Sequence, residues 1–122
     1  EFEVAGDLMS CGPALITRML LEFAGAGARH STLSPDICTR LVMATASGTV
    51  KLLRDGMPGD ELISRVATPG GITAEGVSVL QARLPGVFNE LMDRTLTHAG
   101  RLRDQVSARC AGLAEESRND PA

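Results

Sequence analysis

The sequence has almost no aromatic residues, with three phenylalanines and neither tyrosine nor tryptophan among its 122 residues. Aromatic and β-branched residues favour strands, and no segment alternates apolar and polar residues over the length of a strand, so the sequence predicts no β-sheet. Basic residues are not in excess either, since 12 Lys and Arg stand against 15 Asp and Glu for a formal net charge of -3. We therefore expect neither nucleic acid nor a membrane as a partner.

Cysteine is scarce, and the three cysteines, Cys11, Cys38 and Cys110, lie far apart in the sequence. No pair has the close spacing of zinc ligands, and an odd, scattered set is typical of reduced thiols, so we expect no metal site. No apolar run approaches the roughly 20 residues of a transmembrane helix, and no signal-peptide pattern is present. These features predict a soluble, cytoplasmic chain.

The length predicts one domain with weakly ordered ends. The chain begins Glu1-Phe2-Glu3 without an initiator Met. Glu-Phe is what a common cloning site encodes, so residues 1–6 are expected to be a cloning or linker remnant with sequence missing upstream. Residues 7–114 are the predicted helical domain. Residues 115–122 are polar and cannot bury enough apolar area to offset their ordering entropy, so a disordered tail is expected there.

Apolar residues recur at helical spacing along most of the chain, which predicts an all-α domain of about five helices. A Ser-Cys-Gly-Pro start and a Gly-Ala-Gly end bound the first helix, and Ser34-Pro35 supplies a cap and an N1 proline for the second. Pro69 should end the third helix, and Pro85-Gly86 should separate the last two. The expected ranges are about 10–27, 34–54, 58–66, 72–84 and 87–114.

The last predicted helix carries a long apolar seam. Four of its residues stand seven apart and four more extend the same seam: Met92, Ala99, Val106 and Leu113, with Phe88, Leu96, Leu102 and Cys110. The second predicted helix is apolar on several sides. One chain of this size has few elements with which to cover both surfaces, so we expect an obligate, intertwined homodimer.

The segment from Ala67 to Thr73 is the candidate binding element. Two glycines leave the backbone bare where a helix begins, and unpaired amide hydrogens at such a start can hold a carboxylate. An ordinary turn with Thr73 in the first helical turn explains the same residues, and the residues alone leave both interpretations open. By contrast, Gly25-Ala26-Gly27 is not a dinucleotide loop, because it follows no strand and has His30 where a third glycine is needed.

Three stretches, read in order, resemble landmarks of the C-terminal dimerisation domain of the pyrroline-5-carboxylate reductase family. They are DLMSCGPA at residues 7–14, the Ser34-Pro35 helix start and VATPGGIT at residues 66–73. Cys11 stands where the family usually has a serine, and Leu15 where it has an aromatic residue. This form of the first stretch, with PGGITAEG at residues 69–76, is more similar to the late-competence branch of the family.

The resemblance implies a helical dimerisation domain of the 6-phosphogluconate dehydrogenase C-terminal-like type, separated here from its Rossmann domain. The parent would be an NAD(P)H-dependent oxidoreductase of the proline-biosynthesis type. By analogy, Thr73 would hydrogen-bond the imine nitrogen as the catalytic residue. The backbone of Gly70, Gly71, Ile72 and Thr73 would bind the substrate carboxylate, and Pro13 would lie near the nicotinamide.

The resemblance also implies the ligands and partners of the parent. They are NADP or NAD, a small imine substrate and a second copy of the chain, with assembly beyond the dimer left open. The fragment alone should bind no cofactor, because it lacks the phosphate-binding fold.

Two other functions remain open from the sequence. Cys11 and Leu15 are compatible with the association domain of a non-catalytic competence or regulatory homologue. An unrelated helical interaction module could also match the motifs by chance. A glycine fingerprint after a strand, upstream of Glu1, would support a reductase-like parent over the unrelated module.

Overall fold

The computed structural model describes residues 1–119, and every regular element in that range is helical. The chain forms four continuous helices: Phe2–Arg29, made of α1 (Phe2–Gly6), a π-helical turn η1 (Asp7–Cys11) and α2 (Gly12–Arg29); then α3 (Pro35–Arg54), α4 (Gly59–Val66) and α5 (Ile72–Asn119). The predicted all-α class is confirmed, with four helices in place of about five.

The first helix begins well before Ser10, which the sequence predicted as its cap. Residues 2–6 are already helical, and Ser10 Oγ donates a hydrogen bond to the Gly6 carbonyl at 2.6 Å instead of capping anything. The predicted start was therefore wrong. Pro13 lacks an N–H, and its ring crowds the carbonyl four residues earlier. The widened π-turn just before it, closed by the Gly12 N–H on the Asp7 carbonyl, relieves that crowding.

The same helix also continues past its predicted end at Gly25–Gly27 and stops at Arg29. Neither glycine has a positive φ, so neither forms the left-handed cap that was expected. The side chains near this end pack closely instead, since Ala24 of α2 is 3% exposed and Cys38 of α3 is 5% exposed. A Cβ on Gly27 would lie 3.7 Å from Cys38 Sγ, so a small residue suits the close approach of α2 and α3.

Two exposed ion pairs lie on α2 near this end. Arg29 donates a hydrogen bond to Glu22 at 2.8 Å, and Arg18 lies on the other carboxylate oxygen at 3.4 Å. The hydrogen bond from Arg29 lowers the pKa of the Glu22 carboxyl. All three side chains are exposed, so water screens the pairs and they contribute little to stability.

The second predicted helix has the ends that the sequence indicated. Ser34 Oγ accepts a hydrogen bond from the Ile37 N–H at 3.3 Å, and Pro35 occupies the first helical position. At the other end Gly56 adopts a φ of 104°, a left-handed conformation that favours glycine. Local capping chemistry is therefore sufficient to set both limits of α3.

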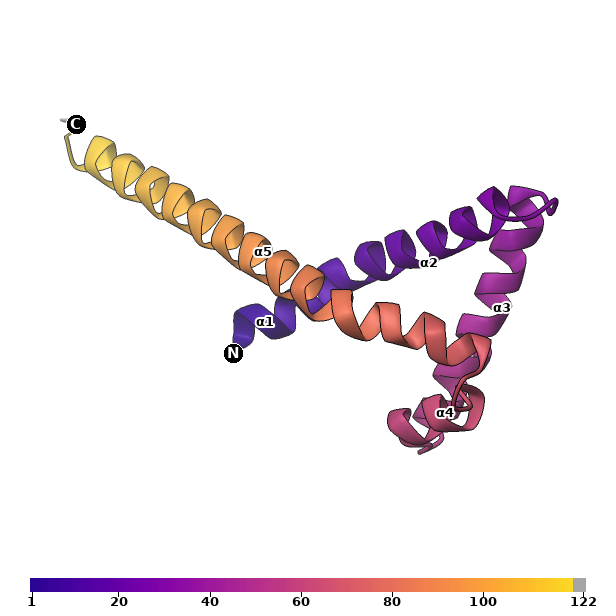
Figure 1. Ribbon diagram of the computed structural model, residues 1–122. Helices are drawn as coiled ribbons and strands as arrows, with labels where there is room; N and C mark the ends of the chain where they lie inside the picture. The colour runs from indigo at the N-terminus through magenta and orange to yellow at the C-terminus, as the bar shows by residue number, and fades with distance from the viewer. Residues whose placement is uncertain (120–122) are drawn as a thin grey trace.

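The helix α5 passes through Pro85-Gly86, where a break was predicted. Pro85 cannot donate to the carbonyl four residues earlier, yet the helix continues on both sides of it. Figure 1 shows a bend part-way along α5, and an interior proline is the usual cause of such a bend. The helix also includes residues 115–119 of the expected tail, whereas residues 120–122 lie outside the described residues.

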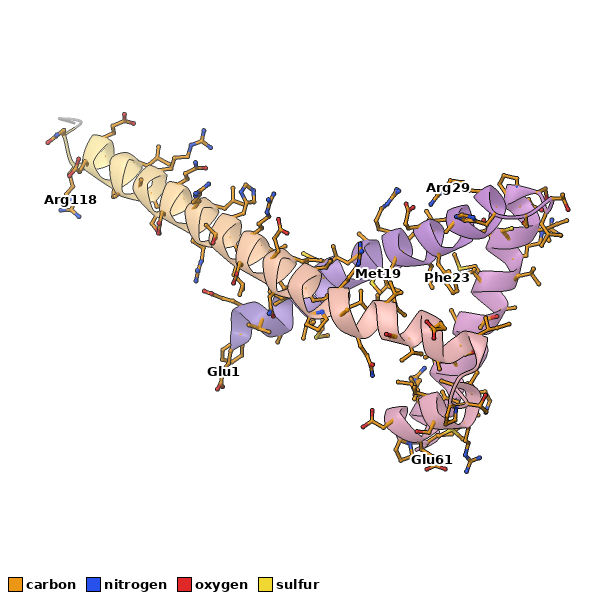
Figure 2. The ribbon with its side chains drawn as sticks, viewed as in Figure 1. Glu1, Met19, Phe23, Arg29, Glu61 and Arg118 are labelled. Atoms are coloured by element: carbon orange, nitrogen blue, oxygen red, sulfur yellow. The ribbon has the colours of Figure 1, made fainter. Side chains whose placement is uncertain are left out.

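The helices form an open framework rather than layers around a core. α2 and α3 make a V that is closed at their connecting turn, and the first part of α5 runs from the foot of α3 back towards the start of α2 (Figure 1). An ion pair between Glu3 and Arg103 joins α1 to α5. Beyond that point α5 projects alone, with side chains directed outward all around it (Figure 2).

A single chain buries almost nothing in this arrangement. Among the described residues, only Gly12, Ala24 and Cys38 are buried. The chain exposes 10092 Å², whereas a folded monomer of its mass exposes about 6,300 Å². Its 48-residue last helix is about 72 Å long, several times the radius of gyration of about 14 Å for a compact chain of this length. The fold therefore leaves large apolar faces for something else to cover.

One of these faces belongs to the continuous helix Phe2–Arg29. By length and composition this helix could cross a membrane, with a mean hydropathy of 1.2 and 6% of its apolar window buried. The expectation that no run approaches that length was therefore wrong. The observation is weak evidence for a membrane span, because the core helix of a water-soluble assembly passes the same test.

Candidate functional site

The loop between α4 and α5 is a tight turn built by Thr68, Pro69, Gly70 and Gly71. The Gly71 N–H donates to the Thr68 carbonyl at 2.9 Å, and Gly70 has a φ of 73°. Proline followed by a glycine of positive φ is the arrangement of a type II turn. The sequence therefore determines the shape of this turn locally, without help from packing.

We expect Gly71→Ala to distort this turn. A Cβ on Gly71 would lie 2.7 Å from Thr68 Oγ1 and 3.0 Å from the Thr68 carbonyl oxygen, so the turn must open. The predicted cost is roughly 1 to 3 kcal/mol in the free energy of unfolding. Gly76→Ala is the matched control, since a Cβ there meets nothing within 4 Å in α5 and should stabilise the helix by about 0.5 to 1 kcal/mol. Chemical denaturation of both variants would check this, and equal stabilities would contradict the prediction.

The turn leaves backbone N–H groups without hydrogen-bond partners at the start of α5. The first hydrogen bond into this helix runs from the Glu75 N–H to the Gly71 carbonyl, at 3.3 Å. The amides of residues 72–74 precede that bond and so have no acceptor within the helix. Ile72 is 95% exposed and Thr73 is exposed. The predicted carboxylate-binding backbone and the Thr73 hydroxyl are thus accessible at a helix N-terminus, where an anion is favoured.

The first motif, the DLMSCGPA stretch at residues 7–14, lies on the π-helical turn η1 and the start of α2. Pro13, the residue predicted to lie near a nicotinamide, is exposed, and Gly12 before it is buried. Cys11 is half-buried, with its Sγ 3.9 Å from Asp7 Oδ1. The second carboxylate oxygen, Asp7 Oδ2, is buried and has no hydrogen-bond partner among the described residues. The sequence analysis gave Asp7 no role. The one feature that could have indicated it is the spacing of four residues, one helical turn, between its carboxylate and the Cys11 thiol.

The fold does not bring the two motifs together within one chain. The Glu3–Arg103 ion pair holds α1, which precedes the first motif, against α5 well beyond Pro85, whereas the α4–α5 turn lies at the opposite end of α5's first part (Figure 1). A site that contains both Pro13 and Thr73 would therefore have to combine residues of two chains. Among residues 1–119, no group of three His, Cys, Asp or Glu side chains is placed to hold a metal ion.

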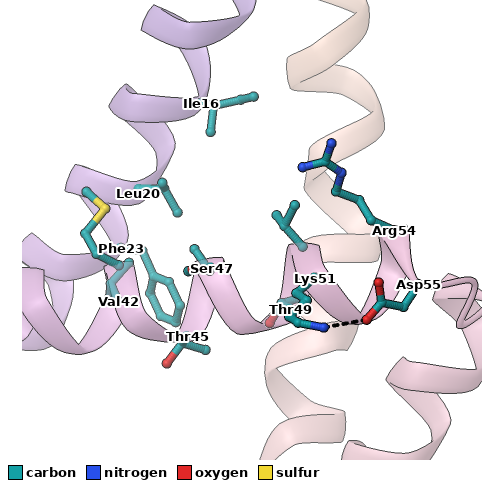
Figure 3. A pocket seen from close by; sticks show the side chains of 13 residues that line it. Ile16, Leu20, Phe23, Val42, Thr45, Ser47, Thr49, Lys51, Arg54 and Asp55 are labelled. Atoms are coloured by element: carbon teal, nitrogen blue, oxygen red, sulfur yellow. Dashed lines mark hydrogen bonds and ion pairs between the residues drawn. The ribbon is translucent and has the colours of Figure 1, made fainter.

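A groove of about 830 Å³ lies between α2 and α3, away from both motifs. Most of its lining is apolar, with the hydroxyl residues Thr45, Ser47 and Thr49 on the α3 side. Charged side chains stand at one end, where Lys51 and Asp55 form an ion pair at 2.7 Å beside Arg54 (Figure 3). Sequence periodicity predicted the apolar faces, but the groove also depends on the angle at which the two helices meet.

These features define a helical domain with large uncovered apolar faces and an exposed Pro-Gly-Gly turn at the start of α5. Residues 1–108 match the sequence model of the family described as pyrroline-5-carboxylate reductase dimerisation. The chain belongs to this family. The predicted family is therefore confirmed, and a chance resemblance in an unrelated helical module is excluded.

Individual relatives agree with this assignment. The chain is 38% identical over 107 residues to pyrroline-5-carboxylate reductase 3 of Bacillus subtilis, covering 87% of this chain and 39% of that protein. It is 32% identical over 103 residues to the pyrroline-5-carboxylate reductase of Aquifex aeolicus, covering 83% of this chain and 38% of that protein. The chain thus spans about two fifths of the length of these relatives.

A solved structure shows the same fold. The crystal structure of Plasmodium falciparum pyrroline carboxylate reductase with NADP bound superposes with a TM-score of 0.64 at 26% sequence identity, covering 77% of this chain and 35% of that one. The ComE operon protein 4 of Bacillus subtilis is similar at 27% identity over 93 residues. The reductases above match at higher identity, so the alternative of a non-catalytic competence homologue is not favoured.

Proposed function

We propose that this chain is the dimerisation and substrate-loop domain of an NAD(P)H-dependent reductase that acts on pyrroline-5-carboxylate. The observation that carries the proposal is the Pro69-Gly70-Gly71 turn, which presents unpaired amides and the Thr73 hydroxyl at the start of α5 in a member of this family. The partner is a second copy of the chain, and the compartment is the cytoplasm. The apolar face of Phe2–Arg29 is then covered by protein rather than by lipid.

Reduction of the proposed substrate requires two binding interactions from this domain. The substrate carries a carboxylate and a ring C=N bond, and reduction requires that both be held in a fixed orientation. The amides of Ile72 and its neighbours, at the positive end of the α5 dipole, suit the carboxylate. The Thr73 hydroxyl is one residue further along and donates a hydrogen bond to the ring nitrogen, which polarises the C=N bond towards attack at carbon.

The hydride would be supplied by a reduced nicotinamide cofactor, NADPH or NADH, when one is bound. Within residues 1–119 no glycine-rich turn follows a strand, so the described chain has no phosphate-binding fold of its own. Pro13 contributes a rigid, exposed surface for the nicotinamide ring at the start of α2. Because the turn and Pro13 lie apart in one chain, we place the complete site across two copies.

The decisive test is an activity assay of the parent protein with pyrroline-5-carboxylate and each reduced cofactor. Turnover is expected with the parent. This chain alone should give no turnover and no calorimetric binding of either cofactor at micromolar concentration. Tight cofactor binding by this chain would place the cofactor site within residues 1–122 and contradict the assignment. A parent that is correctly folded yet inactive would refute the catalytic proposal and revive the competence-type alternative.

A further inference from the structure

We propose that the groove between α4 and the first part of α5 is the apolar half of the substrate site, and that it admits cyclic imine carboxylates with an alkyl group on the ring. The inference rests on the proposed function and adds a substrate class to it. The groove is separate from the larger one between α2 and α3, and the two share no lining residue.

The α4–α5 groove is short and apolar. Its volume is about 410 Å³, and small-molecule pockets usually have about 300 to 1,000 Å³. Gln81 is the one polar side chain among the described residues that line it. Ile63 is 45% exposed and Leu80 is 52% exposed, so a single chain leaves the groove open. Its main apolar walls are Ile63 from α4 and Val77, Leu80, Leu84 and Phe88 from α5.

The groove begins just beyond the candidate turn. At 100° per residue, Thr73, Val77, Leu80 and Leu84 fall within about 60° of one another around α5, so the predicted catalytic residue and the groove share one face of the helix. Val77 is one turn, or about 6 Å, further along the helix axis than Thr73. Figure 1 shows α4 beside this end of α5. The polar helix start and the apolar groove therefore form one continuous surface.

The proposed substrate has the same distribution of polarity. Its carboxylate and its ring nitrogen lie on one side of a five-membered ring, and two methylene carbons, C3 and C4, form the opposite edge when the imine carbon is C2. With the carboxylate on the amides of residues 72–74 and the nitrogen at the Thr73 hydroxyl, the methylene edge points along α5 towards Val77. Apolar side chains around that edge exclude water, which strengthens the hydrogen bond to the nitrogen.

The groove is longer than an unsubstituted ring requires. It extends along α5 from Val77 to Phe88, which is roughly 16 Å at the helical rise, whereas the methylene edge reaches only its first turn. An alkyl group on C3 or C4 extends into the remaining space and buries its carbons against Ile63 and Leu80. Each methylene buried in such a pocket contributes to binding of the substrate. The substrate class is therefore alkyl-substituted cyclic imine carboxylates, of which pyrroline-5-carboxylate is the smallest member.

The test compares two substrates in the parent protein, pyrroline-5-carboxylate and its 3-ethyl homologue. The measured quantity is the ratio of their kcat/KM values. The natural parent is expected to favour the ethyl homologue by roughly 10-fold, mainly through a lower KM, because two more carbons are buried. Leu80→Trp fills the groove and should lower this ratio by at least ~10-fold. Val77→Ala widens the groove and should keep the ratio above 1, which provides a second variant if Leu80→Trp fails to fold.

A matched control and a second measurement accompany the kinetics. Val79→Trp places the same bulk on α5 at a residue that is 57% exposed and does not line the groove, so the ratio should stay unaltered. Calorimetric titration with cyclopentanecarboxylate and 3-ethylcyclopentanecarboxylate makes the same comparison without turnover, with the same expected preference. It therefore tests the groove even in an inactive parent. Sedimentation equilibrium of each variant reports whether the dimer is intact.

Three results would overturn the inference. One is a natural parent that binds the ethyl probe no better than the unsubstituted one, and another is a Leu80→Trp variant with an unchanged ratio. The third is a Leu80→Trp variant that loses the dimer while Val79→Trp keeps it, which would show that a second copy covers the groove. In each case turnover of pyrroline-5-carboxylate by the natural parent leaves the proposed function standing. A parent that prefers the ethyl probe but reduces neither imine would support the groove and refute the proposed function.

Discussion

This chain should sediment as a homodimer at low micromolar concentration and should lose its helices when the dimer separates. The physical reason is the near absence of an internal core, since Ala24 and Cys38 are the only buried hydrophobic residues in the described range. Ordering a chain costs roughly 1 to 2 kcal/mol per residue in backbone entropy, which burial of apolar surface must offset. One copy by itself offers too little burial, so folding and association are expected to be a single equilibrium.

The signature of that equilibrium is a denaturation midpoint that depends on protein concentration. A tenfold increase in concentration adds about 1.4 kcal/mol to the apparent free energy of unfolding, which moves the urea midpoint upward by roughly 0.5 to 1.4 M for the usual range of slopes. Denaturation followed by helical circular dichroism over a hundredfold range of concentration would measure it. A folded monomer with a constant midpoint would falsify the dimerisation proposal.

In the parent protein, Thr73→Ala should lower turnover of pyrroline-5-carboxylate by roughly 10- to 150-fold. The estimate takes the hydroxyl as a hydrogen-bond donor to a ring nitrogen that gains electron density in the reaction, worth ~1.5 to 3 kcal/mol. Thr73 is exposed in the first turn of α5, so its removal should not disturb packing within the chain. The dimer and its stability are therefore expected to be unchanged.

Two companion variants make the Thr73 result specific. Thr73→Ser keeps the hydroxyl and should retain most of the activity, because only a methyl group is lost. Thr95→Ala removes a hydroxyl from elsewhere in α5, where Thr95 Oγ1 donates to the Met92 carbonyl at 3.2 Å, and should leave the kinetics unaltered. Steady-state kinetics of the three variants would decide the matter. If an active parent tolerated Thr73→Ala without loss, Thr73 would be only part of the helix start.

Elements whose ends have their own local chemistry were predictable from the sequence. Ser34 with Pro35 set the start of α3, and the Pro69-Gly70-Gly71 turn follows from a proline and a glycine in the positions that a type II turn requires. The predictions failed where local signals conflicted with a longer context. Pro85 indicated a break, but apolar residues at helical spacing continue on both sides of it, and the helix bends there instead of ending.

The predicted start of the first helix was wrong for a related reason. Ser10 has the right chemistry for a cap, but residues 2–9 can themselves form a helix, and the π-turn Asp7–Cys11 absorbs the effect of Pro13. A widened turn has no reliable sequence signal, because it depends on how the backbone relaxes around a missing N–H group. The sequence does place the Asp7 carboxylate one helical turn before Cys11, but the burial of its unpaired oxygen depends on tertiary packing.

The sequence by itself determined the helical class, the family and the shape of the turn that precedes Thr73, because periodicity, capping residues and the Pro-Gly-Gly order act over a few neighbouring residues. Only the tertiary structure decided that α2 and α3 diverge around a groove and that α5 is one continuous helix. It also decided that the end of α5 projects beyond the other helices of the chain. Those features depend on the angles between elements distant in sequence. Such angles follow from which apolar faces meet, and in this protein most of those faces have no partner within a single chain.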